Sequence, residues 1–221
     1  MGAWQLSRWS EKRALAGVLR EALARPAVPL PADSGEWPAV HHRRVIVTGA
    51  LDASWQVLLS DRWRGDSAGV EVITPVRLSS GEVALLDRGG LPSPDGIHAT
   101  PGTWLEPGAT AWTALLEPLP AHAKTSAWDL LRANSPTLYS ARALGADSLA
   151  ARAPFPIAPW VLRALPEPSA PALPARETPQ PPDATMHLSY AVQWFLFALA
   201  FLAGGWFVLR RSRSPAGPGH P

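Results

Sequence analysis

The sequence predicts an α+β protein: a β-rich domain, either a small antiparallel sheet or an open barrel with short helices, anchored by a C-terminal transmembrane helix. Three observations lead to this fold class. An uncharged apolar run covers residues 188–209, short β-branched runs recur between residues 44 and 117, and leucines near the N-terminus have helical spacing. The 221 residues leave room for one core of about 150 residues with appendages.

The apolar run is long enough to cross a bilayer. As a helix with a rise of ~1.5 Å per residue, residues 188–209 would span roughly 33 Å, which is the thickness of a hydrocarbon core. Arg210, Arg211 and Arg213 follow at once. The positive-inside rule therefore places the basic tail, residues 210–221, in the cytoplasm. The chain that precedes the transmembrane helix (residues 187–209) then lies on the extracytoplasmic side.

Residues 1–25 have the pattern of an amphipathic helix. Leu15, Leu19 and Leu23 recur at intervals of four, and Pro26 ends the pattern. This stretch holds no apolar export segment, although the domain after it must cross the membrane. We therefore expect a first transmembrane helix upstream of Met1, missing from this sequence.

The β-rich domain is expected within residues 26–153. Five short runs predict strands, at residues 44–49, 55–60, 70–78, 83–88 and 110–117. Residues 79–81, between the third and fourth runs, predict a tight turn. Residues 130–153 show a mixed pattern with one or two short helices. Residues 154–182 carry ten prolines, which predicts an extended Pro-rich linker over residues 154–186.

Composition excludes several classes of function. Of the 20 basic residues three follow the apolar run, which leaves 17 against 18 acidic residues before it. That balance argues against a nucleic-acid partner. The chain has no cysteine, so disulfides, thiolate metal sites and cysteine nucleophiles are excluded. The richness in Ala, Gly, Pro and Arg is typical of GC-rich coding and indicates a bacterial source.

Residues 65–69 spell G-x-S-x-G, the motif that presents a nucleophilic serine in some hydrolases. In those enzymes the serine lies between a strand and a helix. Here the motif is followed by a β-branched run, and a Gly, Asp, Ser, Gly cluster between two strands is typical of a turn. Hydrolysis through Ser67 is therefore a distant alternative.

His187 has a position that the other histidines lack, since it opens the predicted transmembrane helix. Tyr190 and Trp194 follow on the same helix face. One interpretation is an interfacial anchor with aromatic neighbours. The other is an axial ligand of a haem iron, with Tyr190 and Trp194 supplying flat surface for the macrocycle. Because both ends of the domain are tied to one interface, we expect residues 4–8 and 187–194 to lie close together.

Four stretches resemble the Surfeit locus protein 1 family of cytochrome c oxidase assembly factors, and they occur in that family's order. They are GAWQLSRWSEKRAL (2–15), RRVIVTGALD followed by LLSDR (43–52 and 58–62), GVEVITPVRLSSGEVALLDRG (69–89), and HLSYAVQWFLFA (187–198). The family has two transmembrane helices flanking an extracytoplasmic domain. The resemblance therefore implies a protein of the bacterial inner membrane whose first helix precedes residue 1.

The resemblance also implies a non-catalytic function. It implies that the protein binds haem a, with His187 as the metal ligand, and assists its insertion into the catalytic subunit of the oxidase. That subunit and the haem a synthesis machinery would be its partners. Arg88 matches a motif position of the family, either as a ligand contact or as a structural residue that pairs with Asp87 or caps a strand. The family's R-G-W is here Arg88, Gly89 and Gly90. The alternative is a membrane scaffold that stabilises an assembly intermediate without haem.

Overall fold

The computed structural model describes residues 2–104, 106, 108, 110–123, 127–180 and 185–212, apart from the side chains of Trp63, Arg64 and Ser212. They form two units. The helical unit combines the start of the chain, up to Arg20, with residues from Gln180 on, and the sheet domain covers Glu21–Pro179. The expected first transmembrane helix and the tail beyond residue 212 lie outside the described residues.

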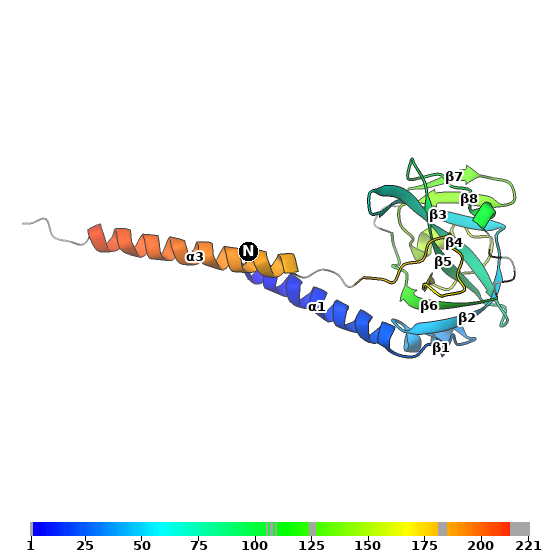
Figure 1. Cartoon of the computed structure of the whole chain (residues 1–221), viewed down its shortest axis with the longest axis horizontal. Coiled ribbons are helices and arrows are strands. Elements are labelled where there is room, and N and C mark those ends of the chain that lie inside the picture. Colours follow the sequence, from blue (N-terminus) through cyan, green and yellow to red (C-terminus); the bar gives the residue numbers. More distant parts are fainter. Residues whose placement is uncertain are drawn as a thin grey trace, which may run out of the picture. The chain divides into compact units, whose positions relative to one another are not determined.

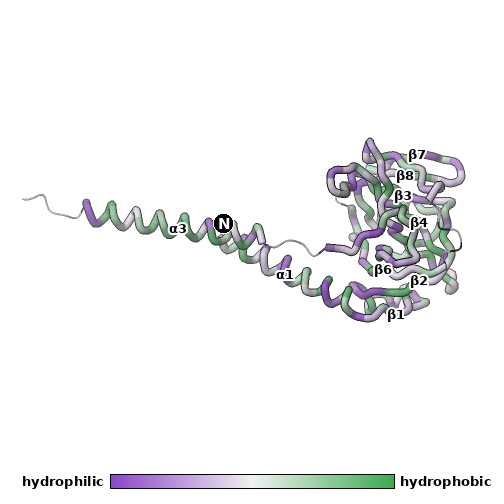
Figure 2. The backbone as a smooth tube through the Cα atoms, in the orientation of Figure 1, coloured by the Kyte–Doolittle hydropathy of each residue, from purple (hydrophilic) through white to green (hydrophobic). Residues whose placement is uncertain are grey.

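Two long helices make up the helical unit (Figure 1). The first, α1 (Gly2–Ala24), confirms the helix expected near the N-terminus and ends just before Pro26. The second, α3 (Thr185–Ser212), contains the predicted apolar run. Its mean hydropathy reaches 1.9 over an 18-residue window within Thr185–Arg211, and none of that 18-residue window is buried inside the molecule. Figure 2 shows the same helix coloured largely as hydrophobic. Its length and composition therefore fit a membrane-spanning helix.

The described strands of the other unit form one nine-stranded sheet, in the order β1-β2-β6-β9-β5-β4-β3-β8-β7. The strands are β1 (Val28–Pro29), β2 (Arg44–Leu51), β3 (Trp55–Arg64), β4 (Ser67–Leu78), β5 (Val83–Pro92), β6 (Ala111–Pro118), β7 (Trp128–Arg132), β8 (Thr137–Ala141) and β9 (Trp160–Ala164). Short helices lie between some of them: η1 (Ser34–Val40), η2 (Pro101–Trp104) and α2 (Ala146–Ala150). The five predicted strands correspond to β2 through β6.

The expected antiparallel sheet or open barrel is wrong in two respects. The sheet is mixed, because β1 pairs with β2, β3 with β8 and β5 with β9 in parallel. The barrel is also closed rather than open, since β2 pairs with β4 in addition to β6. The strands β2, β6, β9, β5 and β4 then form a ring of pairings. The length of β4 makes this possible, because its start pairs with β3 and its end with β2.

The prediction of an extended Pro-rich linker over residues 154–186 is also wrong, because this segment contributes strand β9 to the sheet. There β9 pairs with β5 on one side and with β6 on the other. Pro159 and Pro166 lie outside the two ends of this strand and leave its ladder intact. Leu162 and Ala164 of β9 are buried in the main core. Residues 128–141, which lie largely in the mixed region, hold β7 and β8, and one short helix, α2, follows.

Among the described residues, the core of the sheet domain consists of three apolar clusters. One cluster combines Trp37 from η1 with residues of β2, β4, β5, β6 and β9. A second cluster joins β3, β4, β5 and β8 to α2, and a third joins β3, β4, β5 and β8 at residues that alternate with those of the second. Polar side chains buried next to these clusters are therefore held in a rigid, water-poor frame.

Candidate functional site

His187 lies in the first turn of α3 and contacts the first turns of α1. Its Nδ1 is 2.6 Å from Oε1 of Gln5, and the ring is half-buried. The ring of Trp4 stands edge-on to it, with centroids 6.4 Å apart at 86°. A carbonyl oxygen can only accept a hydrogen bond, so Nδ1 carries the proton. The expected proximity of residues 4–8 and 187–194 is thereby confirmed for Trp4, Gln5 and His187.

The two helices also touch at a small residue, Gly2. His187, Ala191 and Phe195 form a stripe at intervals of four on α3, and Ala191 in its middle is 1% exposed. Gly2 lies against the Phe195 ring, because a Cβ atom at this glycine would come within 3.1 Å of the ring. Small side chains let helices approach closely. Gly2 at the Phe195 ring is thus a second contact between α1 and α3, beside that of Gln5 with His187.

Tyr190 and Trp194 lie on the neighbouring side of α3 and are exposed. The Trp194 ring packs edge-on against Phe197, with centroids 6.3 Å apart. By helical spacing, three and seven residues after His187, both side chains lie within two turns of it and beside the stripe that holds Ala191. His187, Tyr190 and Trp194 therefore combine one imidazole with an accessible aromatic surface.

The donor set at this place suits one kind of metal group. With Nδ1 protonated, the lone pair of a neutral imidazole is on Nε2, and that atom has no hydrogen-bond partner among the described residues. The described residues also hold no group of three or more His, Asp or Glu side chains that could cage a bare ion. A haem iron is held by its macrocycle and takes only axial ligands from the protein. His187 with Tyr190 and Trp194 thus fits a haem.

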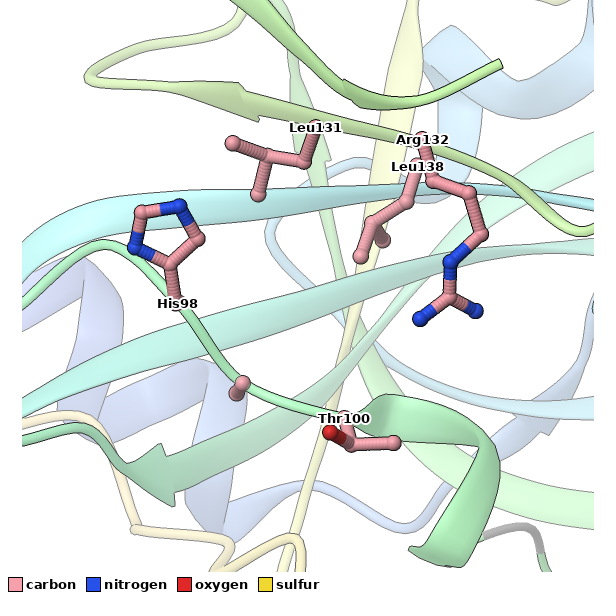
Figure 3. A pocket seen from close by; sticks show the side chains of 6 residues that line it. His98, Thr100, Leu131, Arg132 and Leu138 are labelled. Carbon is pink, nitrogen blue, oxygen red and sulfur yellow. The ribbon is translucent and has the colours of Figure 1, made fainter. Parts of the chain in front are cut away.

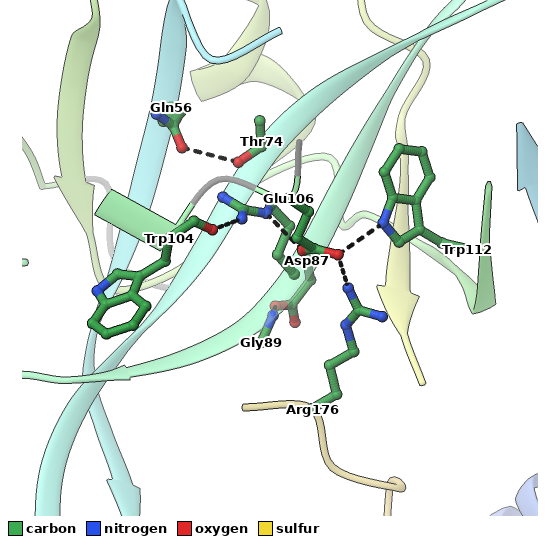
Figure 4. A network of polar contacts seen from close by, with 9 residues as sticks. Gln56, Thr74, Asp87, Gly89, Trp104, Glu106, Trp112 and Arg176 are labelled. Atoms are coloured by element: carbon green, nitrogen blue, oxygen red, sulfur yellow. Dashed lines mark hydrogen bonds and ion pairs between the residues drawn. The ribbon is translucent and has the colours of Figure 1, made fainter. Parts of the chain in front are cut away.

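Arg88 belongs to the sheet domain, where it is fully buried on β5. It donates from Nε to Oε1 of Glu106 at 3.3 Å and from Nη2 to the carbonyl oxygen of Trp104. Glu106 also accepts from Nε1 of Trp112 at 3.3 Å and from Nη2 of Arg176 (Figure 4). Burial lowers the pKa of Arg88, and the Glu106 carboxylate opposes this shift.

The partner of Arg88 is Glu106, and not the Asp87 that its structural interpretation expected. Successive side chains of a strand point to opposite faces, so Asp87 and Arg88 do not meet. Asp87 is 5% exposed and accepts a hydrogen bond from the amide of Gly89 at 3.0 Å. Burial and the nearby Glu71 carboxylate raise the pKa of Asp87 to about 7.

A pocket of about 280 Å³ lies elsewhere on the sheet domain (Figure 3). It is lined by His98, Ala99, Thr100, Leu131, Arg132 and Leu138. His98 is held by Asp95, whose Oδ2 is 2.7 Å from Nδ1 of the ring. None of the residues that the sequence singled out lines this pocket.

The comparison with known proteins adds the family. The model of the SURF1 family matches residues 1–199, which include α1, all nine strands and the first half of α3. This chain belongs to the SURF1 family. Members of this family are known generally as oxidase assembly factors, and the family is not a catalytic one.

A curated relative of this SURF1 family member is a SURF1-like protein from Monosiga brevicollis. The two are 33% identical over an alignment of 103 residues, and the match covers 42% of this chain and 40% of that protein. The chain therefore spans about two fifths of the length of the curated relative that it matches.

Sequence reasoning missed two residues of the buried network in this SURF1 family protein, Glu106 and Arg176. They lie 18 and 88 residues after Arg88, one in a loop and one in the segment expected to be a linker. No spacing connects three such positions. Gln5 lies in the stretch WQL of the N-terminal helix. Its contact with His187 could not be predicted from neighbouring residues, because the two are 182 positions apart in the sequence.

The G-x-S-x-G motif of this SURF1 family member lies at a hairpin. Gly65 and Asp66 form the turn between β3 and β4, where Arg64 is paired with Ser67. Ser67 is exposed at the first position of β4 and not at a strand-to-helix elbow. The turn expected from the sequence is confirmed.

Proposed function

We propose that this protein binds haem a through His187 and assists the insertion of that haem into the catalytic subunit of a cytochrome c oxidase. The observation that carries the proposal is the imidazole of His187, whose Nδ1 is engaged by Gln5 and whose Nε2 has no partner in the described part of the chain. Membership of a family of oxidase assembly factors supports the choice of ligand.

Each residue has a defined part in the proposal. His187 would hold the iron through the Nε2 lone pair, and Tyr190 and Trp194 would offer flat aromatic surface to the macrocycle. A porphyrin is flat and mostly apolar, so a site at the end of an apolar helix lets it remain at the membrane edge, out of water. The protein would hold the haem through the bond from Nε2 to the iron and release it when that bond breaks, with no other bond of the haem changed.

The proposal includes an orientation in the bacterial inner membrane. Arg210 and Arg211 end α3, and basic residues favour the cytoplasmic side. His187, at the other end of the helix, would then lie at the extracytoplasmic surface together with the sheet domain. The partners would be the oxidase catalytic subunit and the machinery that makes haem a.

Absorption spectra of the purified protein test the proposal. We would express the full chain with haem a synthesis enzymes, purify it in detergent and measure the haem stoichiometry and the Soret band. His187→Ala should lose most of the haem while the protein stays folded by circular dichroism and remains in the membrane fraction. Tyr190→Phe is the matched control, because it keeps the ring and removes only a hydroxyl.

Two results would count against the proposal. If His187→Ala keeps the stoichiometry and Soret maximum of the parent, the ligand role is wrong and His187 is an interfacial anchor. If the parent itself acquires no haem a, the protein acts as a scaffold that stabilises an assembly intermediate.

A further inference from the structure

We propose that Gln5 is a positioning residue for His187: its side-chain carbonyl holds the imidazole in the Nδ1–H tautomer and aims Nε2 at the haem iron. This inference rests on the proposed function. It starts from the 2.6 Å contact between Gln5 Oε1 and His187 Nδ1, which joins the first turn of α1 to the first turn of α3.

The contact decides the chemistry of the ring. A neutral imidazole has one N–H and one lone pair, and the atom that donates a hydrogen bond leaves the other free to bind a metal. Metal-binding histidines almost always donate their second N–H to an oxygen, which fixes the ring and makes the ligating nitrogen more basic. Gln5 Oε1 occupies the place of that oxygen.

The surroundings of Gln5 make the contact rigid. Gln5 stands on a helix whose start is held against α3 by Gly2 at the Phe195 ring. Trp4 stands edge-on to the imidazole and restricts its rotation from a second direction. No second side-chain hydrogen bond of the His187 ring is made among the residues that the structure describes. An interfacial anchor would need none of this, because water could satisfy its ring nitrogens.

An amide suits the position better than a carboxylate. A glutamate would also accept from Nδ1–H, but its charge would be costly next to the apolar surface of α3. A carboxylate would also withdraw the proton further from the ring and raise the electron density on Nε2. Gln5→Glu should therefore keep haem binding and lower the reduction potential of the haem, whereas Gln5→Leu should lose the hydrogen bond entirely.

Haem titration tests the inference. We would titrate the detergent-solubilised full chain with haem a, comparing the parent with Gln5→Leu, Gln5→Glu and His187→Ala. Gln5→Leu should weaken binding about 10- to 100-fold, and Gln5→Glu should bind within a few-fold of the parent with a more negative potential. Gln193→Leu, the same change at an exposed position of α3, is the matched control and should bind like the parent. In the His187→Ala background, Gln5→Leu should cause no further loss.

A second measurement does not depend on haem. Nitrogen NMR of ¹⁵N-histidine-labelled apoprotein should show His187 as the Nδ1–H tautomer in the parent, and a shift towards Nε2–H in Gln5→Leu. The inference is overturned if the parent shows the Nε2–H tautomer, or if Gln5→Leu binds haem as the parent does while His187→Ala does not. If Gln5→Leu binds haem as the parent does and His187→Ala does not, the proposed function of His187 still stands. A parent that binds no haem overturns both.

Discussion

Arg88 and Glu106 form an ion pair that is shut off from solvent, with side chains 0% and 6% exposed and Nε to Oε1 at 3.3 Å. Arg176, which is 3% exposed, shares the same carboxylate. Two guanidinium groups thus depend on one carboxylate in a buried setting. The pairing joins β5, the loop before β6 and the segment after β9, so three stretches of the sheet domain are held at one point.

Glu106→Gln should lower the free energy of unfolding of the sheet domain by about 3–5 kcal/mol, because removing one partner of a buried ion pair leaves uncompensated charge. Urea unfolding of the full chain in detergent, followed by tryptophan fluorescence, measures it. Asp61→Asn is the control, since its pair with Arg142 at 3.0 Å is exposed and should contribute less than about 1 kcal/mol. Equal losses in the two variants would contradict a special role for Glu106.

Asp87→Asn should remove a pH dependence of stability. The pKa of Asp87 is raised from 3.8 to about 7 in the folded chain by burial and Glu71. Between these values the folded state keeps a proton that the unfolded state releases, so stability from this group is lost as pH rises from about 4 to 7. The Asn variant should match the parent near pH 4 and exceed it near pH 8 by up to about 4 kcal/mol, at about 1.4 kcal/mol for each pKa unit.

Thermal unfolding across this pH range tests the prediction. Asp52 provides a comparison of opposite sign, because hydrogen bonds with Ser54 and Arg77 outweigh its partial burial and lower its pKa. Asp52→Asn should therefore be less stable than the parent near pH 7 and should match it at strongly acidic pH, where the parent carboxyl is protonated and its stabilising charge is lost. Parallel curves for the parent and Asp87→Asn would show that Asp87 does not titrate between pH 4 and 7.

Gly89→Ala should destabilise the sheet domain far more than Gly65→Ala. Both glycines have positive φ, +109° and +57°, which costs an alanine about 1–2 kcal/mol. Only at Gly89 would the added Cβ also collide with backbone, since it would lie 2.4 Å from the carbonyl oxygen of Ala175. Gly90 and Ala175 exchange two backbone hydrogen bonds, so Ala175 cannot withdraw freely. Similar melting temperatures of the two variants would refute the clash.

Single cysteines should report the orientation of the chain, because the natural sequence contains none. Ser67→Cys is exposed on the sheet domain and should react with a membrane-impermeant maleimide in intact spheroplasts. Ser214→Cys, beyond the basic end of α3, should react only after the membrane is opened, as the positive-inside rule requires. If only the Ser214→Cys variant reacts in intact spheroplasts, the chain has the opposite orientation in the membrane.

The local patterns of the sequence determined the helices and most of the sheet. The intervals of four in α1, the uncharged run of α3 and the β-branched runs of β2 to β6 each depend on residues close together in the chain. Strands β1, β7, β8 and β9 were missed because β1 has only two residues and each of the others only five. For β9, the surrounding prolines dominate the composition, and its stability comes from pairing with β5 and β6 on either side.

For the candidate site, the sequence alone determined His187, Tyr190 and Trp194, because their position at the start of an apolar helix can be read from neighbouring residues. The tertiary structure decided which groups they meet. Gln5 reaches His187 across 182 positions, and Glu106 joins Arg88 to Arg176 across gaps of 18 and 70. A hydrogen bond or ion pair depends on distance in space, and helical or strand periodicity records only distance along the chain.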